Sequence, residues 1–221
     1  MKRFLIAAAF FASCLPAPAI AEDKEPVHDS IFDDTQMLQG YTEEYRGESK
    51  DYLIAMIRDD TLNPYQTAAA IRVFKEKFSD KVVSREKLLL EKDLIRRLNK
   101  TNAAFVEVEI MHTLCLIDRY KYFYAMVPAL IQKMDHYNPM VNAMAYSALN
   151  QIIESGSNRA REARIIFGTL RKVLFLSRLK LRGVTQPDER LSQKLKLLRW
   201  SIKVLGKQEL KKLPKEVINL L

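Results

Sequence analysis

A short pattern of residues occurs four times along the chain, and it constrains the fold more than any other feature of the sequence. The pattern is an apolar or long residue, a mostly small residue four positions on, and a pair seven and eight positions on. The four copies are Gln66, Ala70, Val73 and Phe74; Val106, Ile110, Thr113 and Leu114; Val141, Ala145, Ala148 and Leu149; and Leu197, Ser201, Val204 and Leu205. Residues at this spacing share one face of an α-helix, so each copy predicts a helix.

The distances between the copies predict how these helices are organised. The copies begin 40, 35 and 56 residues apart, and each follows another amphipathic segment. The first two separations are typical of repeats that consist of two helices, and the third predicts an enlarged last unit. We therefore expect an all-α protein of about four stacked helical pairs, because a single pair cannot bury its own apolar faces.

Start signals and periodicity place the individual helices. Asn63-Pro64 and Asn138-Pro139 each combine a good N-cap residue with a proline suited to the first helical position. The first helices of the pairs are expected at 48–59, 84–99, 120–135 and 159–182, and the second helices at 63–78, 103–118, 138–154 and 188–206. Residues 207–221 are expected to add a short final helix, and no strand is needed.

The third pair resembles the HEAT repeat family. The resemblance is best in the run Val127-Pro128-Ala129-Leu130, and from Val141-Asn142 through Ala145 to Leu149, and it extends more loosely over residues 48–206. It implies a right-handed α-solenoid whose second helices line a concave face, a surface that solenoid proteins use for binding. Pro128 is similar to the proline that kinks the first helix of a HEAT repeat.

The polar positions of the sequence depart from the family pattern. HEAT repeats tend to carry an Asp in the turn between the two helices and an Arg early in the second helix, which form a ladder between repeats. At these two positions the first three copies have Asp60 and Thr67, Lys100 and Glu107, and Asp135 and Asn142. A diverged HEAT-like stack and another stack of helical hairpins both fit this pattern.

The first 21 residues have the three parts of a secretory signal peptide. Lys2 and Arg3 give a positive start, residues 4–12 are apolar, and Ala19-Ile20-Ala21 is a small-x-small cleavage site. Two prolines interrupt the apolar run well before the roughly 20 residues that a transmembrane helix needs. We therefore expect cleavage after Ala21, a mature chain without a transmembrane segment, and a periplasmic or secreted location.

The two cysteines bear on how an exported chain is processed and stabilised. Cys14 ends the run Phe11-Ala12-Ser13-Cys14, which loosely resembles a bacterial lipobox, so lipidation at Cys14 is the alternative to cleavage after Ala21. Removal of the signal leaves Cys115 alone, and no intramolecular disulfide can then form. Because Cys115 stands in an apolar run, we expect it to be a buried small hydrophobic residue.

Charge is distributed unevenly along the chain, whose formal net charge is +9. Residues 22–51 contain ten Asp or Glu against three Lys or Arg, whereas residues 159–215 contain seventeen Lys or Arg against four Asp or Glu. We expect residues 22–47 to be an acidic N-terminal arm and residues 48–221 to be the helical domain. The opposite charges suggest that the arm folds back on the basic region.

Basic residues of the last pair are the main candidates for a binding surface. They flank apolar positions on the expected helix 159–182 and on the helix that follows it. They are Arg164, Arg171, Lys172, Arg178, Lys180 and Arg182, then Lys196, Arg199 and Lys203. An acidic protein, lipid headgroups and polyanionic glycans all fit such a face. The alternative is an ordinary solvated face on an enlarged repeat.

Residues 120–124 place four aromatic side chains in five positions near the start of an expected helix. Tyr120, Tyr122 and Tyr124 are candidate interface anchors, because aromatic side chains bury large areas at low entropic cost. The same residues equally suit a seam between the second and third repeats.

No catalytic residue, metal or cofactor is expected. The sequence has no G-x-S-x-G nucleophile motif and no glycine-rich phosphate loop, and its three histidines are scattered. Glu109 and His112 share a helical face, but di-metal sites need two such motifs, so we expect a surface hydrogen bond instead. Carboxylate pairs leave little linear trace, so an enzyme with an acidic site stays the third hypothesis.

The leading hypothesis is a non-catalytic adaptor or scaffold in the periplasm of a Gram-negative bacterium. It would hold a protein partner through its concave face and its basic C-terminal half. The second hypothesis is a peripheral envelope protein that binds anionic lipid or glycan through the basic C-terminal helices. Nucleic acid would satisfy the electrostatics, but an exported protein rarely meets it.

Overall fold

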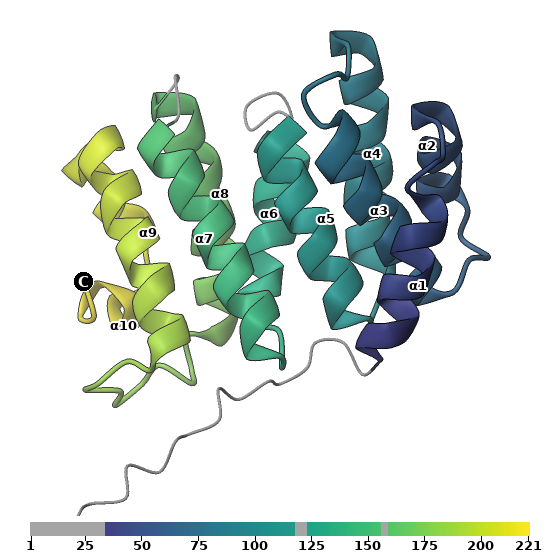
Figure 1. Ribbon diagram of the computed structural model, residues 1–221. Helices are drawn as coiled ribbons and strands as arrows, with labels where there is room; N and C mark the ends of the chain where they lie inside the picture. The colour runs from purple at the N-terminus through teal and green to yellow at the C-terminus, as the bar shows by residue number, and fades with distance from the viewer. Residues whose placement is uncertain (1–33, 118–122, 156–158) are drawn as a thin grey trace, which may run out of the picture. The chain divides into compact units, whose positions relative to one another are not determined.

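The computed structural model describes residues 34–117, 123–155 and 159–221, and Figure 1 shows that these ranges are built from helices. No strand occurs among the described residues, so the predicted all-α class is confirmed. In chain order the helices are α1 (Thr35–Tyr45), α2 (Lys50–Arg58), α3 (Pro64–Phe78), α4 (Ser84–Lys100), α5 (Ala104–Ile117), α6 (Phe123–Lys133), α7 (Pro139–Ser155), α8 (Arg159–Ser177), α9 (Glu189–Leu205), the 3₁₀ helix η1 (Lys207–Lys212) and α10 (Lys215–Ile218).

The helices of residues 34–221 pack in two rows (Figure 1). Helices α1, α3, α5 and α7 pack on one another in chain order, and α2, α4, α6 and α8 form the second row. Each helix of the second row also packs on the helix that follows it, which gives the pairs α2 and α3, α4 and α5, α6 and α7, and α8 and α9. The pairing predicted from the repeat spacing is therefore observed.

Side-chain caps explain why the helices start where they do. The Oδ1 atom of Asn63 accepts from the backbone N–H of Gln66 at 2.8 Å, and the Gln66 side chain accepts from the Asn63 N–H at 3.3 Å. This capping box satisfies two donors that the first turn of α3 leaves without helical partners. Asn138 accepts from Met140 N at 2.9 Å at the start of α7. The four second helices begin and end within one residue of their expected bounds.

The residues of the repeated pattern lie where neighbouring helices meet. All of them are buried except Gln66, Val204 and Leu205, which are half-buried. Ala70, Ala145 and Ala148 are small and fully buried, and small side chains let packed helices approach closely. The predicted core role of the pattern is therefore confirmed.

Two members of the pattern are polar and yet buried. The hydroxyl of Thr113 donates to the Glu109 carbonyl at 2.8 Å, and the hydroxyl of Ser201 donates to the Leu197 carbonyl at 2.9 Å. Both bonds run to the residue four positions earlier in the same helix, so neither hydroxyl is buried without a partner. Cys115 is buried as well, as expected.

Helix α1 was not among the expected helices. Its buried side chains are Leu38, Thr42 and Tyr45, and it packs on α3. Residues 35–45 therefore belong to the packed helices and are not part of a separate arm, so the boundary expected at residue 48 lies too late in the chain. The spacing of 4 and 3 between these residues is helical, but the acidic composition of the segment hides it. Residues 22–33 lie outside the described residues.

Helix α8 is shorter than expected. It ends at Ser177, whose hydroxyl bonds the carbonyls of Val173 and Leu174 at 3.1 and 3.3 Å. Residues 178–182 continue in tight turns, and Gly183 has φ +77°, which favours glycine and ends the run. Arg178, Lys180 and Arg182 therefore lie beyond α8, not on it.

None of the described helices combines the length and the apolar character needed to cross a bilayer.

Candidate binding surface

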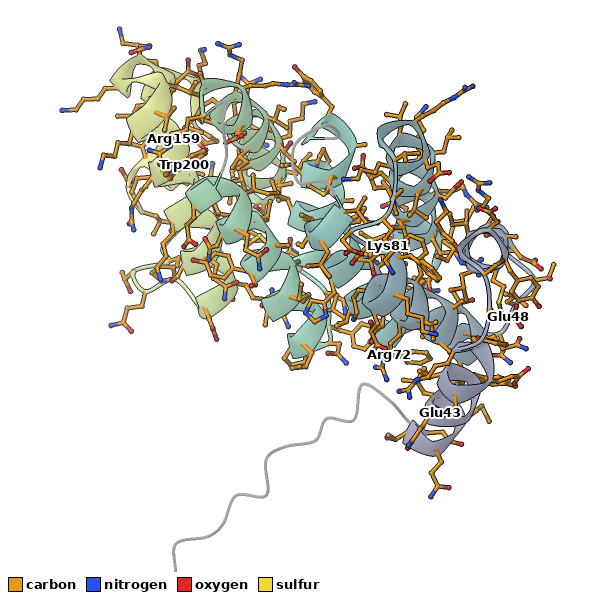
Figure 2. All side chains as sticks on the ribbon, turned by 45° about the horizontal axis from the view of Figure 1, so that its top comes forward. Glu43, Glu48, Arg72, Lys81, Arg159 and Trp200 are labelled. Atoms are coloured by element: carbon orange, nitrogen blue, oxygen red, sulfur yellow. The ribbon has the colours of Figure 1, made fainter. Side chains whose placement is uncertain are left out.

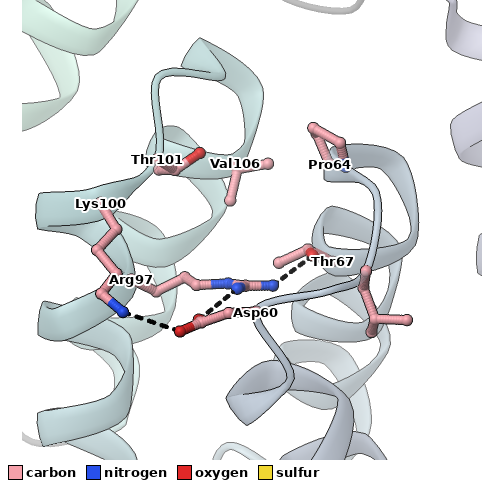
Figure 3. Close-up of a pocket in the computed structure, with 8 residues that line it drawn as sticks. Asp60, Pro64, Thr67, Arg97, Lys100, Thr101 and Val106 are labelled. Carbon is pink, nitrogen blue, oxygen red and sulfur yellow. Dashed lines mark hydrogen bonds and ion pairs between the residues drawn. The ribbon is translucent and has the colours of Figure 1, made fainter.

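Consecutive helical pairs are joined by ion pairs at the ends where the two helices of each pair connect. Between the first and second pairs, the Asp60 carboxylate contacts Arg97 at 2.6 Å and Lys100 at 2.9 Å (Figure 3). It also contacts Arg96 at 2.5 Å. The Arg97 guanidinium also donates to the Thr67 hydroxyl at 2.8 Å. Hydrogen bonding from Lys100 and the two arginines lowers the pKa of Asp60 to about 2.

The residues in Figure 3 line a hollow of about 250 Å³. Its charged groups already satisfy one another, because the Asp60 carboxylate and the Arg97 guanidinium lie in direct contact across it. This hollow lies at a junction between two pairs, and both of its cations bond the same carboxylate.

The same arrangement recurs at the next two junctions. Glu107 of the second pair is fully buried and contacts Lys133 Nζ of the third pair at 2.6 Å, with His136 Nε2 at 3.5 Å. Asp135 of the third pair forms an ion pair with Lys194 of α9 in the fourth. In these three contacts the earlier pair supplies the acid and the later pair supplies the base.

The sequence indicated two of the junction acids, Asp60 and Asp135, but neither Glu107 nor the bases. Asp60 and Asp135 stand at the acidic position of the repeat, while Arg97 and Lys133 lie on the first helix of the following pair. The family pattern places its arginine early in the second helix, whereas Arg97 and Lys133 lie near the end of the first helix. The position of a base within its own repeat does not reveal its partner. Only the stacking of α4 and α6 on the preceding pair brings these bases close to the acids.

Further ion pairs join helices of the first helical pair to helices of the second. Lys50 contacts Glu86 at 2.7 Å and Arg58 contacts Asp93 at 2.6 Å, both between α2 and α4. Glu109 of α5 is buried, and its carboxylate contacts the Arg72 guanidinium at 2.6 Å and Lys75 Nζ at 2.5 Å. Both cations belong to α3. The Glu109 side chain therefore points to α3, and the surface hydrogen bond expected with His112 is not its role.

The basic residues of the last pair have a different environment. Figure 2 shows the two ends of the described helices, with Glu43 and Glu48 on the α1 and α2 side and Arg159 and Trp200 on the α8 and α9 side. Among the predicted site residues, Arg164 and Arg171 are brought together in a hollow of about 390 Å³ between α8 and η1, which Lys212 also lines. Lys172 follows Arg171 and is exposed.

The three predicted residues beyond α8 are separated from one another. The Arg178 guanidinium lies 4.1 Å from the centre of the Phe175 ring and donates to the Phe175 carbonyl at 2.9 Å. Arg182 forms an ion pair with Glu216 of α10 at 3.2 Å. Lys180 is exposed in the turn between them.

On α9, Lys196, Arg199 and Lys203 follow one another at spacings of three and four, so they share one helical face. The Arg199 guanidinium donates to the main-chain oxygens of Leu220 and Leu221 at 2.9 and 3.1 Å, which ties the end of the chain to α9. The side chains of six predicted basic residues form no ion pair, hydrogen bond or ring contact in the described ranges. These are Arg164, Arg171, Lys172, Lys180, Lys196 and Lys203.

The predicted aromatic anchors are only partly within the described residues. Tyr120 and Tyr122 lie outside them. Tyr124, near the start of α6, is largely exposed, and the Arg161 guanidinium of α8 lies 5.2 Å from the centre of its ring. An exposed aromatic beside a cation is compatible with an interface, but it also packs α6 on α8.

Within the part of the chain that the structure describes, no three His, Cys, Asp or Glu side chains are grouped as metal ligands would be. Comparisons of the chain with protein-family models, with curated proteins and with solved structures find no match. The proposed function therefore rests on the geometry of the binding surface.

Proposed function

We propose that the protein is a non-catalytic adaptor or scaffold of the periplasm or the secreted space, built as a right-handed HEAT-like solenoid. Its basic last pair, α8 and α9, holds an acidic protein partner. One observation carries the proposal: eight of the thirteen described cations in residues 48–155 form ion pairs between helical pairs, whereas the side chains of six predicted cations of the last pair have no partner among the described residues.

Two observations support the solenoid part of the proposal. The helices pack in two rows in chain order, and every junction between consecutive pairs carries an acid from the earlier pair and a base from the later one. Nearest-neighbour contacts of this kind are how solenoids are stabilised. An experimental structure in which successive pairs are not related by a constant right-handed rotation would contradict it.

The unpaired cations support an anionic partner. Exposed Lys172, Lys196 and Lys203 generate a positive field that raises the association rate of an acidic protein, and this field weakens as salt screens it. A partner that supplies carboxylates to these side chains would complete on the last pair the acid-to-base pairing that the earlier junctions already have.

The test is crosslinking of the protein in intact cells of the source organism, followed by identification of the partner. The variant Lys172→Glu/Lys196→Glu/Lys203→Glu should lower partner recovery by at least about tenfold without changing thermal stability much. The matched control Lys81→Glu/Arg85→Glu/Lys92→Glu reverses three exposed cations elsewhere and should leave recovery unchanged. Equal recovery with both variants would contradict the proposal, because the basic face would then be only solvated surface.

A second candidate, peripheral attachment to anionic lipid, is favoured by a separate observation. At and just beyond the end of α8, Phe175, Leu176 and Leu179 are 51%, 81% and 61% exposed. Lys172 and Lys180 are exposed in the same stretch. Apolar side chains surrounded by cations are the composition of segments that lie in a membrane interface.

Vesicle co-sedimentation separates the two candidates. If lipid is the partner, vesicles containing phosphatidylglycerol should bind the protein and pure phosphatidylcholine vesicles should not. Leu176→Ser/Leu179→Ser should abolish that binding while partner crosslinking persists. The absence of binding to anionic vesicles at low salt would rule out the lipid candidate.

A further inference from the structure

The hollow between α8 and η1 has the size and the charge of a ligand site. Its volume of about 390 Å³ lies within the range of roughly 300–1,000 Å³ that small-molecule sites occupy. From α8 it is lined by Arg164, Gly168 and Arg171, which stand four and three positions apart and so share one helical face. The facing wall comes from η1, whose sequence lies about forty residues further along the chain.

The charges in this hollow are not balanced by the protein. Lys212 contacts Glu209 at 2.8 Å, so the one acidic residue of the lining is already paired. Arg164 and Arg171 form no ion pair with any described acidic side chain, and they leave an excess of two positive charges in the hollow. A guanidinium offers planar pairs of N–H donors that match the oxygens of phosphate or carboxylate.

The wall that η1 provides depends on Gly206. Its backbone has φ +107°, a conformation that side chains rarely adopt, and a Cβ there would lie 2.4 Å from the Gln208 Oε1 atom. Gln208 in turn donates to the Leu205 carbonyl at 2.7 Å. The turn at Gly206 therefore leads the chain from α9 into η1, which packs on α9 and supplies this wall.

Gly168 lines the α8 side of the hollow, called its floor below, and lies between the two arginines in the sequence. Glycine within a helix costs about 1 kcal/mol relative to alanine, yet a Cβ at Gly168 would meet nothing within 4 Å. Packing in the free protein does not require glycine here. Gly40 in α1 is also free of neighbours, so a helical glycine alone indicates nothing. At Gly168, however, a Cβ would occupy space inside the cationic hollow.

We propose that this hollow binds the phosphoryl group of a phosphate ester, with Arg164 and Arg171 as its ligands and Gly168 giving the group close access to the helix. The excess of two positive charges fits a dianionic phosphomonoester better than a monocarboxylate. Two sources supply a phosphomonoester, a free phosphorylated compound and a lipid whose headgroup is one, such as phosphatidic acid.

Titration calorimetry with glycerol 3-phosphate at about 0.05 M salt tests the site, with glycerol and acetate as uncharged and singly charged controls. Saturable binding of glycerol 3-phosphate alone is expected. Arg164→Gln and Arg171→Gln should each weaken it by about tenfold or more, and Lys196→Gln, outside the hollow, should leave it within about twofold. Absence of saturable binding by a folded protein, or equal weakening by all three variants, would overturn the proposal.

A pair of glycine substitutions tests the floor of the hollow. Gly168→Ala and Gly40→Ala should both raise the melting temperature, by about 2–4 °C, because each replaces a helical glycine that has open space. Only Gly168→Ala should weaken glycerol 3-phosphate binding, by about tenfold or more. If Gly168→Ala binds glycerol 3-phosphate as tightly as the unmodified protein, the phosphoryl group does not lie against Gly168. That result would overturn the proposal.

Vesicles that contain phosphatidic acid distinguish the two sources. If glycerol 3-phosphate displaces the protein from the vesicles and Gly168→Ala no longer binds them, the site accepts a lipid headgroup. If glycerol 3-phosphate binds but vesicles do not, the site serves a free phosphate ester. The result is independent of the proposed protein partner, because Lys172→Glu/Lys196→Glu/Lys203→Glu leaves the hollow intact and Gly168→Ala leaves that basic face intact.

Discussion

The first three helical pairs and the last pair use positive charge in different ways. In the first three, Arg97 and Lys133 reach across a junction to an acid of the preceding pair, and Arg72 and Lys75 share the buried Glu109. In the last pair, Lys194 does the same with Asp135, but most other cations have no acidic partner in the described ranges. Most cations of the first region are therefore engaged in the stack, whereas most of those in the second are available to a partner.

Burial explains why the two kinds of cation should respond differently to mutation. A buried charge that loses its partner has no water to replace it, so its removal is costly. An exposed cation is solvated whether or not a partner is present, and its contribution to stability is small. Removing charges from each region in turn tests this difference in their contribution to stability.

The largest effect is expected at the junction of the second and third pairs. Glu107→Leu should lower the free energy of unfolding by about 3 kcal/mol, because it leaves the mostly buried Lys133 without its carboxylate. Urea unfolding measures the loss. The double variant Glu107→Leu/Lys133→Met should recover at least half of it, because no stranded cation remains. A double variant as unstable as the single one would mean that the ion pair does not join these pairs.

A smaller loss is expected at the first junction, where Asp60 is more accessible to water. Arg97→Met should cost about 1–2 kcal/mol, because Arg97 is 8% exposed and bonds both Asp60 and Thr67. Arg96→Met is the matched control: it contacts the same carboxylate from a side chain that is 36% exposed, and it should cost about 0.5 kcal/mol or less. Equal losses in the two variants would show that burial does not decide the contribution.

The pH dependence of stability should report the same junction. The cations around Asp60 hold its pKa at about 2, below the value of the unfolded chain. Between these two pKa values the unfolded state binds more protons, so stability rises with pH there. The contribution of Asp60 is therefore present above about pH 4 and is lost as the pH falls toward 2. Thermal melts of Asp60→Asn should show a flatter acid limb than the unmodified protein; an unchanged limb would contradict the assignment.

The smallest effect is expected in the last pair. Lys196→Gln/Lys203→Gln should change the free energy of unfolding by no more than about 0.5 kcal/mol, because both side chains are exposed and have no described acidic partner. Urea unfolding at low and high salt gives the measurement. A loss of about 2 kcal/mol or more would show that these lysines stabilise the fold, and the contrast between the two regions would then disappear.

The helices themselves could be predicted because their signals are local. The spacing of apolar residues, the Asn-Pro starts and the repeated pattern place the second helices within one residue of their observed bounds. The sequence predicts a longer α8 than the structure has, because apolar residues continue at helical spacing through Leu179 and Leu181. The helix ends at Ser177, and the chain turns at Gly183. Helix α1 was missed, although Leu38, Thr42 and Tyr45 have the spacing of a buried face.

The candidate site could be predicted only as a region. The sequence indicated the basic last pair, but it did not separate Arg178, which stacks on Phe175, and Arg182, which pairs with Glu216, from cations without partners. It also gave no sign of the hollow, because Lys212 belongs to a tail for which only a short helix was expected. The partners of these cations and the hollow both depend on contacts between residues that are far apart in the sequence. Such contacts produce no periodic pattern in the chain.

The sequence alone therefore determined the all-α class, the four helical pairs and the position of their buried faces, because helix formation depends on residues three and four positions apart. The tertiary structure decided which charges meet. Arg97 reaches Asp60 only because α4 stacks on the first pair, and Arg164, Arg171 and Lys212 line one hollow only because the chain turns at Gly206. Whether a cation is used for stability or is available to a partner depends on these distant contacts and on the burial that they create.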